Sequence, residues 1–247
     1  MSVNFAKKIE KSSFTNQLEF KQNKRGLPQH PARIMLLGPS GCGKTNLLLN
    51  FLLPSPSKLN YTKLYLFAKD INEPSYEYLR GKLDDKEEKL KKYAEKHKLD
   101  LPEDFALYHT AATLNEVPAV NDIDKTEQNI VIFDDFAIDR QQDIIKEYFI
   151  RARKQNCTLI YLSQSTKAVP KEIKDQIGYL AIFKPAGGYE ITNLARNYGT
   201  DLESKEFKKL INETTKNKGD FLFIDVNEPE KGKKYKHNLT HETAWSE

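Results

Sequence analysis

The sequence predicts an α/β fold, with a mostly parallel central sheet flanked by helices on both of its faces. Two observations support this class. Short apolar runs alternate with longer helix-like segments along the chain, and the runs at 130–133 and 158–162 are apolar almost throughout. A strand that is covered on both faces needs such a continuous apolar run. Helices between consecutive strands favour parallel pairing, and ligands of such sheets bind at the carboxyl ends of the strands.

The predicted elements follow one another in a regular order. Strands are expected at 34–37, 63–67, 105–109, 130–133, 158–162, 179–183 and 221–224. Helices are expected at 46–52, near 76–79, and at 83–98, 139–154, 169–177, 190–198 and 203–216. The charged segment 83–98 contains i,i+4 pairs such as Glu87/Lys91 and Glu88/Lys92, which favour a solvated helix at the periphery.

A glycine-rich segment joins the first predicted strand to the first predicted helix, with the spacing of a phosphate-binding P-loop. The glycines let the backbone wrap so that its N–H groups converge on phosphate oxygens above the positive end of the helix. Lys44 would reach the β- and γ-phosphates, and the Thr45 hydroxyl would ligate Mg²⁺. We therefore expect a nucleoside triphosphate at the loop and the start of the helix, on Gly38, Pro39, Ser40, Gly41, Cys42, Gly43, Lys44, Thr45 and Asn46.

Two adjacent acids follow the apolar run at 130–133. Asp134 stands where a second contact to Mg²⁺ would lie, opposite the hydroxyl of the loop. Asp135 points differently and could polarise the water that attacks the γ-phosphate. The alternative is that both acids cap the loop before the next helix.

A glutamine and two arginines are further candidates for catalysis. Gln164 follows the apolar run at 158–162 and could orient the attacking water, provided that this strand lies between those of the P-loop and Asp134 as in RecA-like sheets. Arg151 and Arg153 near the end of the helix at 139–154 could act in trans as an arginine finger. Cations at a helix C-terminus also interact favourably with the helix dipole, so a purely structural role of the two arginines remains the alternative. Arg196 is a weaker candidate for the finger.

Length and composition indicate one domain with an additional polar segment at each end. We expect a polar N-terminal arm at 1–32, a P-loop domain at 33–226 and a basic polar C-terminal tail at 227–247. The net charge of +4 permits a polyanionic partner without requiring one. The two cysteines encode neither a disulfide framework nor a zinc site. Neither a signal peptide nor a stretch long enough to span a bilayer is visible, so an intracellular location without membrane association is expected.

The segment Asn217-Lys218-Gly219-Asp220 matches the spacing of a guanine-reading motif. That motif normally follows a buried strand, whereas residues 212–216 are polar and helix-like. The segment 134–137 also lacks the glycine of a GTPase switch. We therefore expect 217–220 to form a turn before the strand at 221–224.

The motifs together resemble those of the poxvirus-type genome-packaging ATPases of the FtsK–HerA superfamily, which occur in large DNA viruses, virophages and Polinton-like elements. The resemblance spans roughly residues 30–226, and rests on the loop at 38–45, the acidic pair at 134–135, the arginine-containing segment 148–153 and the run 159–165. The run from 169 to 185 looks similar as well. The arginine helix followed by the Ser-Gln strand end is more specific than the P-loop, which many ATPases share.

The resemblance implies a RecA-like P-loop NTPase that uses ATP and Mg²⁺ to thread double-stranded DNA into a preformed capsid. It implies a homo-oligomeric ring, a capsid or portal-vertex protein as partner, and a place in the host cytoplasm or viral factory, with association with the virion left open. Matched to the motifs, Asp134 is the metal ligand, Asp135 the catalytic acid and Gln164 the sensor. The resemblance carries over no DNA-contacting residues, and the lysines in 205–218 and 231–236 are candidates only because phosphate contacts need accessible cations. A P-loop switch or assembly scaffold that does not move DNA remains the alternative.

Overall fold

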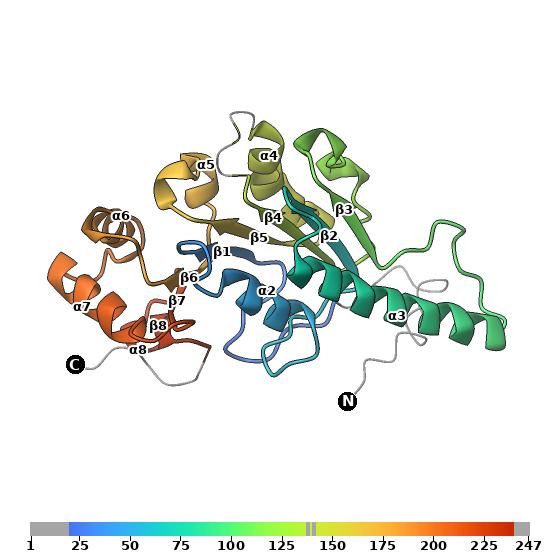
Figure 1. The fold of residues 1–247 in the computed structure, drawn as a ribbon, viewed down its shortest axis with the longest axis horizontal. Coiled ribbons are helices and arrows are strands. Elements are labelled where there is room, and N and C mark those ends of the chain that lie inside the picture. The colour runs from blue at the N-terminus through green and yellow to red at the C-terminus, as the bar shows by residue number, and fades with distance from the viewer. Residues whose placement is uncertain (1–19, 137–138, 140–141, 240–247) are drawn as a thin grey trace.

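The computed structural model describes residues 20–136, 139 and 142–239. In this part of the chain, one sheet with the strand order β3-β2-β4-β5-β1-β6-β7-β8 forms the centre (Figure 1). The strands from β3 to β6 in this order pair in parallel, whereas β7 pairs antiparallel with β6 and with β8. The bounds of the strands are β1 Arg33–Leu37, β2 Lys63–Ala68, β3 Tyr108–Ala111, β4 Asn129–Asp134, β5 Cys157–Ser163, β6 Tyr179–Phe183, β7 Phe221–Asp225 and β8 Tyr235–His237.

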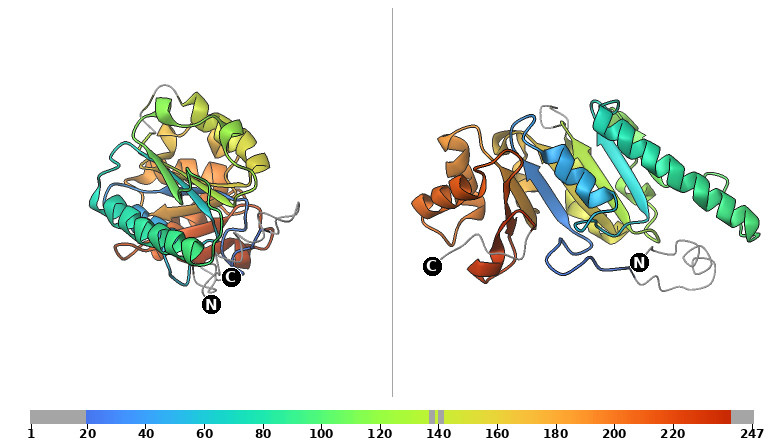
Figure 2. Two further views of the ribbon diagram at one scale, coloured as in Figure 1. Left: turned by 90° about the vertical axis from the view of Figure 1, so that its right-hand side faces the viewer. Right: turned by 60° about the horizontal axis from the view of Figure 1, so that its bottom comes forward.

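Helices cover both faces of the sheet, which confirms the predicted fold class (Figure 2). Alternate strand residues point to opposite faces, so Ile34 and Leu36 of β1 pack with the core under α2 and α3, while Met35 and Leu37 pack with the core under α4 to α7. The bounds of the helices are α2 Lys44–Leu52, α3 Pro74–Lys96, α4 Asp143–Arg151, α5 Lys171–Lys174, α6 Gly188–Tyr198, α7 Ser204–Thr214 and α8 Lys231–Lys234.

Helix α3 joins two segments that the sequence predicted as separate helices. Pro74 occupies its first turn, where a missing N–H costs nothing, and its 23 residues give a length of about 35 Å. The first half packs on the sheet through the buried Tyr76, Leu79 and Leu83, and the second half extends beyond the sheet (Figures 1 and 2). The expected pairs lie there, with Glu87–Lys91 at 2.6 Å and Glu88–Lys92 at 2.5 Å.

Several element boundaries differ from those predicted. The strand expected at 105–109 is β3 at 108–111, and the helix expected at 169–177 is the four-residue α5, which follows Pro170. The helix expected at 139–154 begins at Asp143 and ends at Arg151. Its continuation, Ala152–Gln155, tightens to a 3₁₀ turn that Asn156 closes in the left-handed conformation, at φ 52°. Residues 140 and 141 of that predicted helix lie outside the described residues.

The segments predicted as arm and tail contribute to the core where they are described. In the arm, Leu27 and Ala32 are buried. In the tail, β8 adds an eighth strand to the sheet and its Tyr235 is fully buried. The Tyr235 hydroxyl donates to Asp201 Oδ1 at 2.5 Å, and the largely buried Lys234 pairs with the same oxygen at 3.0 Å. The polar tail expected from residue 227 therefore includes a strand of the sheet.

Candidate nucleotide-binding site

The P-loop lies between the end of β1 at Leu37 and the start of α2 at Lys44. Gly38, Gly41 and Gly43 all have positive φ, at 159°, 71° and 116°. An added Cβ on Gly38 would lie 2.7 Å from the Cβ of Phe183, so no other residue fits there. Because the nine-residue helix α2 begins directly behind the loop, its unpaired N–H groups and its dipole favour an anion at this point.

A cavity of about 350 Å³ opens over the loop at the carboxyl ends of the parallel strands. It brings together most of the residues that the sequence singled out, from the loop and from the ends of β4 and β5. Its lining comprises Ser40, Gly41, Gly43, Lys44, Thr45, Asn46, Lys69, Asp70, Glu73, Asp134, Asp135, Leu162, Ser163 and Gln164. Two predicted loop residues, Pro39 and Cys42, line a different cavity beside the loop.

The Lys44 ammonium lies within the loop itself. Its Nζ donates to the backbone oxygens of Gly38 at 2.6 Å and of Pro39 at 2.9 Å. Charge-assisted hydrogen bonds to phosphate oxygens are stronger than bonds to neutral carbonyls. An anion bound at the head of α2 therefore competes for this ammonium with the two carbonyl groups that hold it here.

Asp134 ends β4 and is held by a tyrosine that the sequence did not single out. The Tyr76 hydroxyl, at the first turns of α3, donates to Asp134 Oδ2 at 2.5 Å, and its side chain is fully buried. Burial raises the pKa of the Asp134 carboxyl above its ordinary value, and the hydrogen bond from Tyr76 opposes this rise. A cation beside Asp134 would favour its ionised form, as Mg²⁺ coordination requires.

Asp135 and Gln164 meet at the edge of the cavity. Asp135 adopts the left-handed conformation at φ 61°, which few residues other than glycine adopt and which occurs often at active sites. Gln164 Nε2 lies 3.5 Å from Asp135 Oδ1. Strand β5 lies between β1 and β4 in the sheet, so Gln164 stands between the P-loop and the acidic pair.

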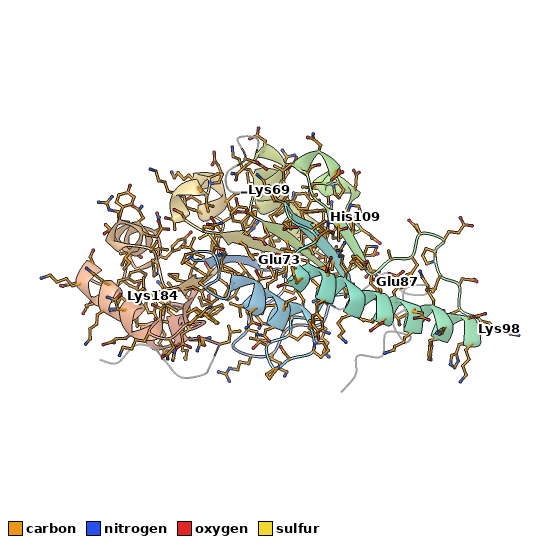
Figure 3. All side chains as sticks on the ribbon, viewed as in Figure 1. Lys69, Glu73, Glu87, Lys98, His109 and Lys184 are labelled. Carbon is orange, nitrogen blue, oxygen red and sulfur yellow. The ribbon has the colours of Figure 1, made fainter. Side chains whose placement is uncertain are left out.

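The loop after β2 supplies site residues that sequence reasoning missed. Lys69, Asp70 and Glu73 line the cavity, and Lys69 Nζ pairs with Asp139 Oδ1 at 2.6 Å. Figure 3 shows Lys69 and Glu73 near the middle of the molecule. Ala68 at the end of β2 pairs in register with Asp134, which brings this loop to the site. The signal available in the sequence was the placement of Lys69 and Asp70 directly after an apolar run.

Arg151 and Arg153 do not line this cavity. Helix α4 runs from the carboxyl end of β4 back to the start of β5, so its last turn lies at the opposite edge of the sheet. Arg151 is exposed and pairs with Glu147 at 2.9 Å, one turn earlier on the same helix. Within one subunit these arginines therefore reach no part of the site, and any role at a phosphate would have to be in trans.

The segment 217–220 forms a turn before β7, as the sequence predicted. Asp220 N donates to Asn217 O at 3.2 Å. The Asp220 carboxylate accepts hydrogen bonds from the side-chain amides of Asn217 at 2.8 Å and Asn238 at 3.1 Å. A carboxylate that reads guanine needs its oxygens for the base, whereas these are already engaged within the protein.

Fold and cavity together define this chain as a RecA-like P-loop NTPase. A family model described as "Poxvirus A32 protein" matches residues 17–225. The chain belongs to this family, which confirms the resemblance to the poxvirus-type packaging ATPases.

Comparison with solved structures gives the same architecture. The chain is similar to the genome packaging NTPase B204 from Sulfolobus turreted icosahedral virus 2 in complex with sulfate, with a TM-score of 0.53 and 12% identity, covering 84% of this chain and 95% of that chain. It is also similar to B204, the DNA-packaging ATPase from Sulfolobus turreted icosahedral virus, with a TM-score of 0.50 and 14% identity, covering 84% and 97%. At these identities the likeness shows the fold. No curated protein matches the sequence significantly.

Proposed function

We propose that the chain is a Mg²⁺-dependent ATPase that drives double-stranded DNA into a viral or virus-like capsid. One observation carries the hydrolytic part: most of the P-loop, the acidic pair Asp134–Asp135 and Gln164 lie at the ends of three different strands, β1, β4 and β5, and line a single cavity. Family membership and the B204 fold, solved with AMPPCP and with ATP-gammaS, support a nucleotide in this place.

The residues present fit a magnesium ion that arrives with the nucleotide. Mg²⁺ is bound in NTPases by phosphate oxygens, waters and one or two protein oxygens, and Thr45 and Asp134 offer two such oxygens in the same cavity. Over 20–136, 139 and 142–239, no cluster of three or more His, Cys, Asp or Glu could hold a metal independently. When bound, the ion would neutralise charge that develops on the phosphates.

The chain's own residues would then divide the remaining work. Lys44 would exchange its two carbonyl partners for phosphate oxygens. Asp135 would accept a proton from the attacking water, and Gln164 beside it would orient that water. Arg151 or Arg153 would act on a neighbouring subunit's nucleotide, which requires a homo-oligomeric ring.

An accessible set of cations supports the DNA part of the proposal. Helix α7 buries Phe207, Leu210, Ile211 and Thr214 and exposes Lys205, Lys208 and Lys209. DNA phosphates are bound by such cations without regard to sequence, in a manner that weakens with salt. We place the protein in the host cytoplasm or viral factory, with a capsid or portal-vertex protein as partner. No helix in the described part of the chain is long and apolar enough to cross a membrane.

The second candidate is an NTPase switch or assembly scaffold that does not move DNA. Slow hydrolysis would suffice for such a role. The Asp135–Gln164 pair and its place in the cavity favour rapid turnover instead, and this observation favours the motor.

The test is ATP hydrolysis with and without double-stranded DNA, using Lys44→Ala as the inactive control. We expect DNA to raise the wild-type rate several-fold, and the Lys44→Ala protein to be inactive under both conditions. Equal rates with and without DNA would favour the switch, and a Lys44→Ala protein with near wild-type activity would refute the site itself.

A mixing experiment tests the ring and the arginines. Subunits carrying both Arg151→Ala and Arg153→Ala are combined with Lys44→Ala subunits, so that some interfaces join an intact P-loop to intact arginines. We expect the mixture to recover activity that neither variant has alone. A mixture that forms mixed oligomers and stays inactive would refute the action of the arginines in trans. The remaining interpretation would be that they only stabilise the C-terminal end of their helix.

A further inference from the structure

A second cavity, of about 460 Å³, lies beside the P-loop. Its walls are Pro39 and Cys42 of the loop, the segment after β6 and the turn before β7. The lining includes Pro39, Cys42, Lys184, Pro185, Ala186 and the segment 216–220. Figure 3 shows Lys184 on the side of the molecule that carries α7, apart from Lys69 and Glu73. The P-loop therefore forms a wall between two cavities.

The turn before β7 packs directly on the P-loop. A Cβ built on Gly43 would lie 3.4 Å from the Cα of Gly219 and 3.2 Å from Cε1 of Phe183, at the end of β6. Gly219 itself has φ 93°, a conformation that favours glycine. This close approach holds the turn before β7 in a fixed position relative to the phosphate-binding backbone.

The direction of a bound triphosphate follows from the position of the hydrolytic residues. Asp134, Asp135 and Gln164 all line the first cavity, so the γ-phosphate has to point there. The nucleoside end of the same molecule then points away from them, across the loop. We propose that the second cavity holds the ribose and purine base of the nucleotide, an inference that rests on nucleotide binding at the P-loop.

The lining predicts how the base is held. Pro185, Ala186 and Gly219 offer apolar surface to a planar ring, and Lys184 and Lys218 are exposed cations at the same cavity. Hydrogen bonds from Asn238 and Asn217 lower the pKa of the Asp220 carboxyl and use its oxygens. The cavity therefore recognises the shape of a purine and lacks a free carboxylate for guanine.

Weak discrimination between purines follows. A site that hydrogen-bonds a distinctive group rejects analogues without it by about 10⁴-fold or more, whereas contact by shape gives only about 10- to 200-fold. We expect the affinities of ATP and GTP for this protein to differ by no more than about 200-fold. A preference for either purine above about 200-fold would overturn this part of the proposal.

The decisive variant fills the cavity. Ala186 is exposed, so Ala186→Trp is compatible with folding while its indole occupies the space assigned to the base. Affinities for ATP and for tripolyphosphate, which has no nucleoside, are measured by calorimetry. We expect ATP binding to weaken at least about 10-fold and tripolyphosphate binding to stay within about twofold of wild type. Ala119→Trp, at an exposed alanine that lines neither cavity, is the matched control and should change neither affinity.

Two results would overturn the proposal. Unchanged ATP affinity in Ala186→Trp would place the base elsewhere, and equal weakening of ATP and tripolyphosphate would mean that the substitution acts on the P-loop. Neither result bears on DNA-stimulated hydrolysis by the wild-type protein, so the proposed function is judged separately. If wild type binds neither ligand, both proposals fail.

Photo-cross-linking of the wild-type protein gives a readout that needs no variant. An azido-adenine ATP analogue is irradiated on the protein, and the modified peptide is identified by mass spectrometry. Modification within 184–186 or 216–220 supports the proposal. Modification within 69–73 or 164–166, around the first cavity, overturns it.

Discussion

Tyr76→Phe removes one oxygen atom that the structure places on the proposed metal ligand. The Tyr76 hydroxyl donates to Asp134 Oδ2 at 2.5 Å, and the ring is fully buried, so phenylalanine keeps the packing and loses only this bond. A hydrogen bond to a charged group contributes about 1.5–3 kcal/mol, and loss of such a partner of a metal ligand typically costs about 10- to 100-fold in metal affinity or activity. We expect the Mg²⁺ concentration for half-maximal ATP hydrolysis to rise by a factor in this range.

The assay is a Mg²⁺ titration of ATPase activity, repeated at several pH values. Because the hydrogen bond from Tyr76 opposes the rise of the Asp134 pKa, its loss raises that pKa further. Protons then compete better with Mg²⁺, so the defect should grow as the pH falls. Tyr78→Phe is the matched control, since Tyr78 lies on the same helix with 56% of its surface exposed. An unchanged Mg²⁺ dependence in Tyr76→Phe would refute the positioning of Asp134 by Tyr76.

Three further predictions concern stability and chemistry. Burial lowers the pKa of His30 to about 4, so the unfolded state takes up a proton below its ordinary pKa of about 6.5 while the native state does not. The free energy of unfolding should therefore fall by about 2 kcal/mol from this group between pH 7 and pH 5, and His30→Asn should abolish that part in denaturant titrations at both pH values. Asp135→Asn should bind ATP in calorimetry with near wild-type affinity and hydrolyse it at least about 100-fold more slowly, since a general base acts in the transition state; loss of binding would instead place Asp135 in the metal shell. Gly199→Ala should destabilise the fold by about 1–3 kcal/mol in thermal unfolding, because its Cβ would lie 2.5 Å from Cδ2 of the buried Phe207; an unchanged midpoint would contradict this packing.

The parts of the fold that the sequence predicted are those that local patterns specify. The apolar runs of β1, β4 and β5 are nearly continuous because helices cover both of their faces, and the glycines of the P-loop are required by its positive φ angles. The gathering of Asp134, Asp135 and Gln164 followed from one rule, that carboxyl ends of parallel strands meet at one edge.

What the sequence did not predict depends on contacts between distant segments. The role of Tyr76 requires that β2 and β4 be neighbours, with Ala68 in register with Asp134, and no local pattern encodes this pairing. Strand β8 has only three residues and follows the lysine-rich helix α8, so the polar composition of this segment concealed the buried Tyr235.

Displacement of a triplex-forming strand from double-stranded DNA tests the central claim most directly. A motor that moves along the duplex removes the third strand, and a switch or scaffold does not. We predict that the wild-type protein displaces the strand only with ATP and Mg²⁺, and that Lys44→Ala displaces none. DNA-stimulated ATP hydrolysis without any displacement, under conditions in which the protein remains bound to the duplex, would contradict the assignment as a DNA translocase.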